Sequence, residues 1–309
     1  MLLKSMIQIQ NKATLSGHQN PIYTVENSQK KGIIFTAGND KGVVEWSLKT
    51  MSFIKVMFPV KSTVYALHCP VAVPLLLAGE QSGQVDVFNF EEQKVTDTLK
   101  FHRLPVFDIQ SIPSKNELLL ASEDGTVSVW DLKSLKLLYN FKVSSDTVRV
   151  ISVSPDERTV AFGCKDNLIR IYRVDDYCLI YELDQHTLPI TSLQFSPDGK
   201  HLISGSRDAQ LKIWSATDYT IVKNIQAHIF SIYSIEFHPL LPYLATASRD
   251  KSIRIWDTEN YELQKTLSFE KGYDMHRLSV NKVIWEPVEN QLISVSDDKL
   301  VKVWDVAVT

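Results

Sequence analysis

Histidine, aspartate and a hydroxyl residue, the three residue types of hydrolase triads, recur at fixed spacing along this chain of 309 residues. In each complete set the hydroxyl lies 18 residues after the histidine, and the aspartate follows four residues later. An alternative hydroxyl lies two residues further on, at Ser206, Ser248 or Ser296. An acyl-transfer enzyme needs one such site, and no set offers a nucleophile on a strained glycine turn, so the repetition favours a structural role. The four complete sets are His18, Thr36 and Asp40; His186, Ser204 and Asp208; His228, Thr246 and Asp250; and His276, Ser294 and Asp298.

An aromatic residue follows each acid position by six residues, and these aromatics reveal an internal repeat. Successive aromatics are 42 residues apart, except that the last two are 48 apart. The six extra residues fall within or near residues 269–274, which predicts a loop insertion there. The aromatics are Trp46, Phe88, Trp130, Tyr172, Trp214, Trp256 and Trp304. The entry markers, 28 residues earlier, are His18, Val60, His102, Ser144, His186, His228 and His276. The acid positions are Asp40, Ser82 (the exception), Asp124, Asp166, Asp208, Asp250 and Asp298.

Short alternating or apolar segments lie between the markers, and turn residues bound them. In the fifth unit, residues 190–195, 201–205 and 210–214 fit strands, and residues 196–199 fit a turn. No segment sustains a helical apolar period over three turns. A repeat of about 42 residues with four strands in each unit is typical of propeller blades. The sequence therefore predicts an all-β fold, with residues 1–309 forming a single seven-bladed β-propeller of four-stranded antiparallel blades.

The markers resemble the WD-repeat family over essentially the whole chain, from the Gly17-His18 dipeptide to the Trp304-Asp305 dipeptide. The resemblance implies that the histidine, the turn acid, a hydroxyl on the second strand and the tryptophan form a hydrogen-bonded structural network in each blade. Two units depart most from the family pattern, the second at Val60, Ser82 and Phe88 and the fourth at Ser144 and Tyr172. The expected network residues are His18, Asp40, Trp46, His102, Asp124, Trp130, His186, Asp208, Trp214, His228, Asp250, Trp256, His276, Asp298 and Trp304.

The two ends of the chain are expected to meet in the last blade. The sequence stops just after the strand that carries Trp304, so the last unit lacks its outermost strand. Residues 6–15 precede His18 as residues 219–225 precede His228. We therefore expect the N-terminal segment to supply the missing strand, which protects the edges of that sheet and leaves no residues for a second domain.

Two variable positions of the repeat point to one binding face. Five residues after each entry marker, where the family places side chains around the mouth of the central channel, four of seven residues are aromatic and suit binding anchors. Directly before the turn acid, three consecutive units are basic, and guanidinium groups bind carboxylate or phosphate. The first set, which we call the ring set, is Tyr23, Tyr65, Phe107, Arg149, Thr191, Tyr233 and Asn281. The second set is Asn39, Gln81, Glu123, Lys165, Arg207, Arg249 and Asp297.

The sequence thus predicts a non-catalytic scaffold, monomeric by itself, that binds an acidic or phosphorylated segment of a partner protein at Tyr23, Tyr65, Phe107, Arg149, Tyr233, Lys165, Arg207 and Arg249. Two alternatives stay open at these positions, namely that the rings only pack between blades and that the basic groups pair with neighbouring acids. A propeller enzyme would need inward carboxylates or histidines, yet the positions after the ring set are uncharged except for Asp108 and Lys282. Nucleic-acid binding through the arginines would depend steeply on salt.

The amino-acid composition further limits the class of protein to which the chain can belong. Apolar residues make up 44% and charged residues 22%, as in soluble globular proteins, and the net charge of −3 argues against binding to polyanions. No apolar run reaches bilayer length, and the first ten residues do not fit a secretory signal. Cys69, Cys164 and Cys178 form no CxxC pair and the histidines are dispersed, so we expect a cytoplasmic protein without metal or cofactor. Glu45 stands where other units have Val or Ile, and needs either a partner or an opening between blades.

Overall fold

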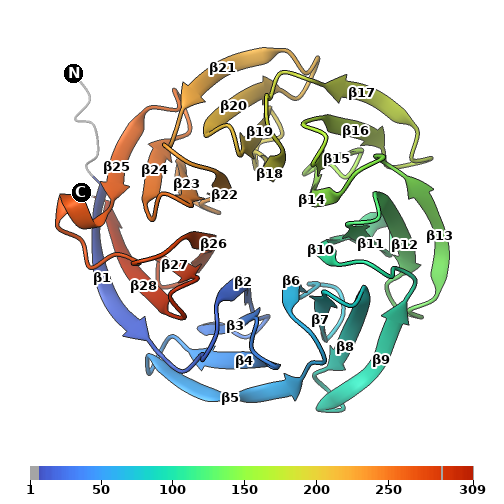
Figure 1. Ribbon diagram of the computed structural model, residues 1–309, viewed down its shortest axis with the longest axis horizontal. Coiled ribbons are helices and arrows are strands. Elements are labelled where there is room, and N and C mark those ends of the chain that lie inside the picture. Colours follow the sequence, from blue (N-terminus) through green and yellow to red (C-terminus); the bar gives the residue numbers. More distant parts are fainter. Residues whose placement is uncertain (1–6, 287, 309) are drawn as a thin grey trace.

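The computed structural model describes residues 7–286 and 288–308, and in these ranges the chain forms a ring of seven four-stranded antiparallel sheets. Figure 1 shows the sheets as blades arranged around a common axis in chain order. The predicted all-β, seven-bladed propeller is confirmed. The helical elements of the described ranges are the short 3-10 turns η1 (Pro113–Lys115) and η2 (Phe269–Lys271), and no described helix has the length and apolarity to cross a membrane.

The blades are numbered 1 to 7 in chain order, and each blade contributes one strand to each of four concentric layers. The inner strands are β2 (Ile22–Asn27), β6 (Val64–His68), β10 (Val106–Ile112), β14 (Val148–Val153), β18 (Ile190–Phe195), β22 (Ile232–Phe237) and β26 (Val280–Glu286). The second strands are β3 (Ile33–Gly38), β7 (Leu75–Glu80), β11 (Glu117–Ser122), β15 (Thr159–Cys164), β19 (His201–Ser206), β23 (Tyr243–Ser248) and β27 (Gln291–Ser296). The third strands are β4 (Gly42–Ser47), β8 (Gln84–Asn89), β12 (Thr126–Asp131), β16 (Ile169–Arg173), β20 (Gln210–Ser215), β24 (Ile253–Asp257) and β28 (Val301–Val308). The outer strands are β5 (Ser52–Pro59), β9 (Lys94–Lys100), β13 (Leu137–Lys142), β17 (Leu179–Leu183), β21 (Ile221–Gln226), β25 (Leu263–Leu267) and, in blade 7, β1 (Ile7–Leu15).

Local sequence explains how a blade turns back on itself. Between β18 and β19 the Ser196 hydroxyl donates to the Asp198 carboxylate at 2.7 Å and accepts from the amide of His201. Gly199 has a φ of +70°, a conformation that a glycine adopts without steric cost. This turn brings the two strands into antiparallel register, with Phe195 opposite Leu202.

The core lies between neighbouring blades, because each sheet buries both of its faces. Val129 of blade 3 and Phe162 of blade 4, for example, belong to one apolar cluster. Trp46, Trp214 and Trp304 are among the largest fully buried side chains. Burial of a large apolar side chain contributes roughly 3 kcal/mol, so the repeat aromatics stabilise the packing of successive blades.

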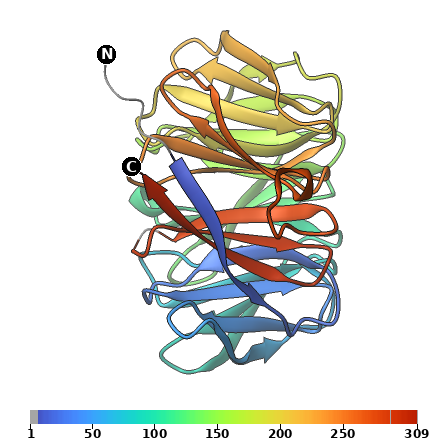
Figure 2. The same ribbon diagram turned by 90° about the vertical axis from the view of Figure 1, so that its left-hand side faces the viewer.

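Strand β1 closes the ring by pairing with β28, as the sequence predicts. The antiparallel register runs from Ile7 opposite Val308 to Leu15 opposite Val301, with a bulge between Asn11 and Ala13. Residue 6, the expected first residue of this strand, lies outside the described ranges. Figure 2 shows β1 beginning and β28 ending on the same side of the disc.

The six-residue insertion forms η2 and the loop after it, and it is fastened to the closing blade. The Tyr273 ring meets Trp304 edge-on at a centroid distance of 6.4 Å. The Lys302 ammonium donates to Asp274 at 2.8 Å and to the hydroxyl of Thr14 on β1 at 2.9 Å. The insertion therefore helps to hold β1 and β28 together.

The unusual carboxylate of Glu45 has a partner. Glu45 on β4 lies opposite Lys55 on β5, and their charged atoms are 3.8 Å apart. Of the two explanations that the sequence left open, the structure supports the partnered carboxylate.

The ring has two distinct faces, because successive strands of a blade run in opposite directions. Loops that enter a blade and turns between its second and third strands lie at one end, which we call the mouth face. Turns between the first and second strands, and between the third and fourth, lie on the opposite face. Entry markers and turn acids therefore share the mouth face with the residues beside them.

Candidate functional site

The histidine, hydroxyl and acid of blade 6 lie in one hydrogen-bonded line that ends at the tryptophan. His228 Nδ1 is 2.8 Å from Asp250, and its Nε2 is 2.8 Å from the Thr246 hydroxyl. The indole N–H of Trp256 donates to the same hydroxyl at 3.0 Å. The same line runs through His18, Thr36, Asp40 and Trp46 in blade 1; His186, Ser204, Asp208 and Trp214 in blade 5; and His276, Ser294, Asp298 and Trp304 in blade 7.

The donor inventory fixes the direction of each bond in this line. The Asp250 carboxylate can only accept, so Nδ1 of the neutral His228 ring carries the proton that faces it. The unprotonated Nε2 accepts from the Thr246 hydroxyl, whose oxygen in turn accepts from the Trp256 indole N–H. Burial lowers the pKa of His228, against the opposing effect of Asp250. Burial alone would raise the pKa of Asp250, but the bond from His228 holds it well below its usual range.

This connectivity is that of a hydrolase triad, but here the hydroxyl oxygen is not accessible to a substrate. The hydroxyl residues Ser204 and Thr246 are fully buried, and the indole occupies an oxygen lone pair in each case. A substrate carbonyl cannot approach such an oxygen. These residues are suited to holding the mouth-face turns in place.

Blade 3 completes its network with a residue that sequence reasoning missed. His102 bonds to Asp124 at 2.8 Å, but its Nε2 is 2.8 Å from Ser128 on the third strand. The Trp130 indole donates to the same Ser128 hydroxyl at 2.9 Å. Ser128 lies directly opposite Leu120, which occupies the usual hydroxyl position, so the hydroxyl reaches the same place from the neighbouring strand.

Blades 2 and 4 lack the histidine and use other partners. In blade 4 the Ser144 hydroxyl donates to Asp166 at 2.7 Å, and the guanidinium of Arg170 binds the same carboxylate at 2.8 Å. In blade 2 the Glu80 carboxylate accepts from both the amide and the hydroxyl of Ser62 at 2.8 Å.

A β-bulge re-aims each residue of the ring set. In all seven blades the register of the inner strand shifts at this residue, as between Ile22 and Thr24, which flank Tyr23. A bulged residue is unpaired in its ladder and turns its side chain away from the regular pleat. The seven side chains are therefore presented separately from the sheets, at the mouth-face end of the inner strands.

Three aromatic rings and one guanidinium of the ring set form a continuous row across blades 1 to 4. Tyr23 stacks on Tyr65 with ring centroids 5.5 Å apart, and Tyr65 contacts Phe107 at 5.0 Å. The Arg149 guanidinium lies 4.5 Å from the centre of the Phe107 ring, a cation–π contact. All four side chains remain partly exposed.

The remaining ring residues have different surroundings. The Thr191 hydroxyl donates to the carbonyl of Ile232 in the next blade, and the Asn281 amide donates to the carbonyl of Ile22 and to Asp297. Tyr233 is partly exposed and lies within electrostatic reach of Arg149. Thr191 and Asn281 thus hold blades together and leave the aromatic row and Tyr233 as the accessible part of the ring.

The basic residues beside the turn acids are not equivalent. Lys165 pairs with Asp146 at 3.2 Å. Within the described residues no carboxylate forms an ion pair with Arg149, Arg207 or Arg249, and the buried Nε of Arg149 has no hydrogen-bond partner. Burial and the positive charge of Arg207 lower the pKa of Arg149. The unmatched positive charge therefore lies on blades 4 to 6.

Charged side chains also line the central axis below the ring set. Asp108 and Lys282 among them were identified from the sequence, whereas sequence reasoning missed Glu26 and Glu236. Burial raises the pKa of Glu26 and of Glu236 to about 7 and that of Asp108 to about 6. Asp108 accepts from the amides of Ile109 and Ile151, and so links blades 3 and 4. Period-two alternation would have found Glu26 and Glu236, because they lie two residues beyond the positions after the ring set. The described residues contain no group of three carboxylates, histidines or cysteines arranged to hold a metal ion.

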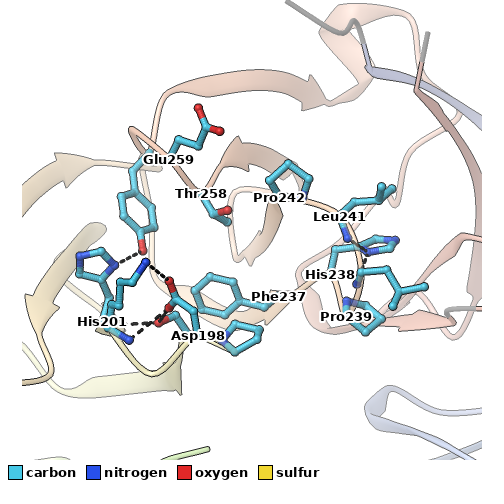
Figure 3. Close-up of a pocket in the computed structure, with 14 residues that line it drawn as sticks. Asp198, His201, Phe237, His238, Pro239, Leu241, Pro242, Thr258 and Glu259 are labelled. Carbon is cyan, nitrogen blue, oxygen red and sulfur yellow. Dashed lines mark hydrogen bonds and ion pairs between the residues drawn. The ribbon is translucent and has the colours of Figure 1, made fainter.

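A groove lies on the opposite face, between blades 5 and 6, and has a volume of about 590 Å³. Figure 3 shows Asp198 and His201 on one side and His238, Pro239 and Leu241 on the other. His201 Nδ1 is 3.0 Å from the Tyr261 hydroxyl, and His238 Nδ1 accepts from the amides of Leu240 and Leu241. Both rings thus have partners in the groove wall.

Comparison with known proteins identifies two related family models. A model described as the first β-propeller of WDR36/Utp21 matches residues 75–259, more than half of the chain. A model described as the WD domain, G-beta repeat, matches residues 9–47 and 267–305, which include the two segments that meet at the closure. A comparison with curated proteins finds no match.

Proposed function

Because the chain belongs to the WD-repeat β-propeller family, we propose that it is a non-catalytic scaffold that binds a segment of a partner protein across the mouth face. The binding residues in this proposal are Tyr23, Tyr65, Phe107, Arg149, Tyr233, Lys165, Arg207 and Arg249. The partner segment is acidic or phosphorylated, and the scaffold is a cytoplasmic monomer that supplies no chemistry of its own.

One observation carries this proposal: Arg149 is partly buried against the Phe107 ring, its Nε has no hydrogen-bond partner, and no carboxylate of the described residues forms an ion pair with it. Glu123 acts on its charge only from a distance, and a second guanidinium, that of Arg207, is close by. A buried charge without a partner costs free energy. A partner carboxylate or phosphate placed between Arg149 and Arg207 would remove that cost and accept hydrogen bonds from both guanidinium groups.

The aromatic row supports the same proposal. Tyr23 stacks on Tyr65, and Tyr65 contacts the tilted Phe107 ring, so the three rings lose little side-chain freedom when a ligand covers them. Aromatic anchors beside a desolvated charge are typical of the residues that dominate binding energy. The ligand would lie with apolar groups on blades 1 to 3 and with its anion over blades 4 and 5.

The experiment compares capture of a partner by folded variants of the full chain. We expect Tyr65→Ala, Phe107→Ala and Arg207→Glu each to weaken binding at least about tenfold. Lys200→Ala is the matched control, because Lys200 lies on the opposite face and pairs with Asp198, and we expect it to change binding less than threefold or so. Undiminished capture by all three mouth variants would refute the proposal.

A further inference from the structure

A group of exposed apolar side chains lies on the mouth-face loops of blades 5 and 6 and on the insertion. Ile229 exposes 72% of its surface, Phe269 71% and Phe230 53%. Leu188 lies in the entry loop of blade 5, two residues after its histidine, as Phe230 does in blade 6. The same two loop positions are polar in blade 1 (Gln19, Asn20) and in blade 4 (Ser145, Asp146).

Arg207 and Arg249 lie directly beside these apolar residues. The amide of Arg207 bonds to the carbonyl of Pro189, next to Leu188, and the amide of Arg249 bonds to that of Ser231, next to Phe230. The Arg249 guanidinium lies 5.8 Å from the centre of the Phe230 ring. The nearest turn acids, Asp208 and Asp250, bond to His186 and His228, and within the described residues neither forms an ion pair with Arg207 or Arg249.

The insertion adjoins this area from the side of blade 7. Glu270, in η2, lies close enough to Asp250 and Lys251 of the blade 6 turn for their charges to act on it. Phe269 is the residue before Glu270 and is held in a 3-10 turn that Gly272 closes with a φ of +83°. Phe269 therefore extends the apolar area at a fixed place rather than on a loose loop.

We propose that Leu188, Ile229, Phe230, Phe269, Arg207 and Arg249, together called the outer shelf, bind a partner segment in which carboxylates alternate with large apolar side chains. This inference rests on the proposed function, because it extends the same partner contact outward from the aromatic row. The arginines take the carboxylates, and the apolar loop residues cover the leucine, isoleucine or phenylalanine side chains between them.

Charge and shape favour a protein segment over a nucleic acid. Of the four apolar residues of the shelf, Leu188 and Ile229 are aliphatic, so only Phe230 and Phe269 offer rings on which a base could stack. The net charge of the chain is −3, and the phosphates of a nucleic acid favour an extended basic surface. The shelf instead alternates charge with apolar area, which complements an amphipathic acidic segment.

The test uses the full chain and a displayed library of random short peptides, so that no partner need be known. The most enriched peptide is synthesised with a fluorescent label, and its affinity is measured by polarisation, with a single-stranded oligouridine as the competing probe. The shelf variants are Ile229→Ser with Phe230→Ser, and Arg249→Glu. The matched control is Arg103→Ser with Leu104→Ser in the equivalent loop of blade 3, and Tyr65→Ala reports on the aromatic row. Circular dichroism confirms that each variant is folded.

We expect enriched peptides rich in Asp or Glu and in Leu, Ile or Phe, with affinity that falls about tenfold in both shelf variants and stays constant in the blade 3 control. If the shelf variants lose affinity and Tyr65→Ala does not, the result supports the outer shelf as the binding site and refutes the aromatic row. Loss in Tyr65→Ala alone refutes the shelf and keeps the proposed function. Unchanged affinity in every variant, tighter binding of the oligouridine, or self-association that the shelf variants abolish, each overturns the inference.

Discussion

Blades 6 and 2 occupy equivalent places in the ring and hold their mouth-face turns by different means. Blade 6 uses a buried polar line from Trp256 through Thr246 and His228 to Asp250. Blade 2 has a buried valine, Val60, at the histidine position, and Phe88 stacks on Phe58 at 5.3 Å where blade 6 has its indole. The two blades share backbone geometry, so the architecture requires a filled core between blades and satisfied polar groups, and the polar line is one solution among others.

The comparison predicts that, of the substitutions considered, one that breaks the polar line of blade 6 lowers the stability most. Asp250→Ala removes the carboxylate that accepts the buried Nδ1 proton of His228 and leaves only the Ser252 hydroxyl, 3.2 Å away, in its place. We expect it to lower the free energy of unfolding by about 3 kcal/mol. Urea denaturation followed by tryptophan fluorescence measures the change. Asp184→Ala, at an exposed position that only bonds to Gln185, is the control and should leave the midpoint unchanged. Equal midpoints for the two variants would contradict a stabilising role for the line.

Removing only the indole donor should cost less. Trp256→Phe makes blade 6 resemble blade 2, but Thr246 then loses the donor to its oxygen and the smaller ring leaves a small cavity. We expect a loss of about 2 kcal/mol, measured by the same urea titration. A cost below about 0.5 kcal/mol would show that neither the indole N–H nor the lost ring volume contributes appreciably to stability.

Blade 4 lies between the two extremes, because Asp166 keeps an arginine partner when its serine is removed. Ser144→Ala deletes one hydrogen bond to Asp166 and leaves the bond from Arg170. We expect a loss of about 1 kcal/mol by urea titration. A loss as large as that of Asp250→Ala would mean that the ion pair with Arg170 depends on Ser144.

The two blades should also respond to pH with opposite sign. Burial, with the charge of Asp86 adding to it, raises the pKa of Glu80 in blade 2, so its stabilising contribution is full below its unfolded pKa near 4.5 and is lost as pH rises through the folded value. The depressed pKa of Asp250 works the other way, and its contribution is lost as pH falls. We expect Glu80→Gln to match the wild type at pH 5 and to gain up to about 1 kcal/mol relative to it at pH 8. Thermal unfolding across this range, with Glu259→Gln as an exposed control, measures the gain; a variant that loses stability relative to the wild type as pH rises would contradict the sign.

The sequence predicts the blades well because each marker is set by packing within one repeat. Trp214 and Asp208 keep their spacing, since a shift of either would leave the indole or the carboxylate without its partner. Ser128 escaped prediction for a physical reason. It lies opposite Leu120 on the neighbouring strand, and strand pairing makes the two positions interchangeable in space while they stay eight residues apart in the chain.

The candidate site was only partly predictable, since its geometry depends on contacts between blades. The sequence places Phe107 and Arg149 at equivalent positions of blades 3 and 4, but not the 4.5 Å contact between them. Nor does it indicate that Lys165 pairs with Asp146 while Arg207 forms no ion pair with any carboxylate in the described part of the chain. Such pairings depend on rotamers and on the bulges that turn the ring residues toward one another.

The pairing of β1 with β28 has a consequence for how the molecule is made. Strand β1 precedes all the other described strands in the chain and its partner β28 follows them, so β1 emerges from the ribosome before them and β28 after them. Until β28 has been made, the segment with Ile7 and Ile9 on one side is an unpaired edge, open to hydrogen bonding with any neighbouring chain. Closure of the ring thus requires a single long-range pairing event, and the rate of that event sets how long this edge of each new copy is exposed to aggregation.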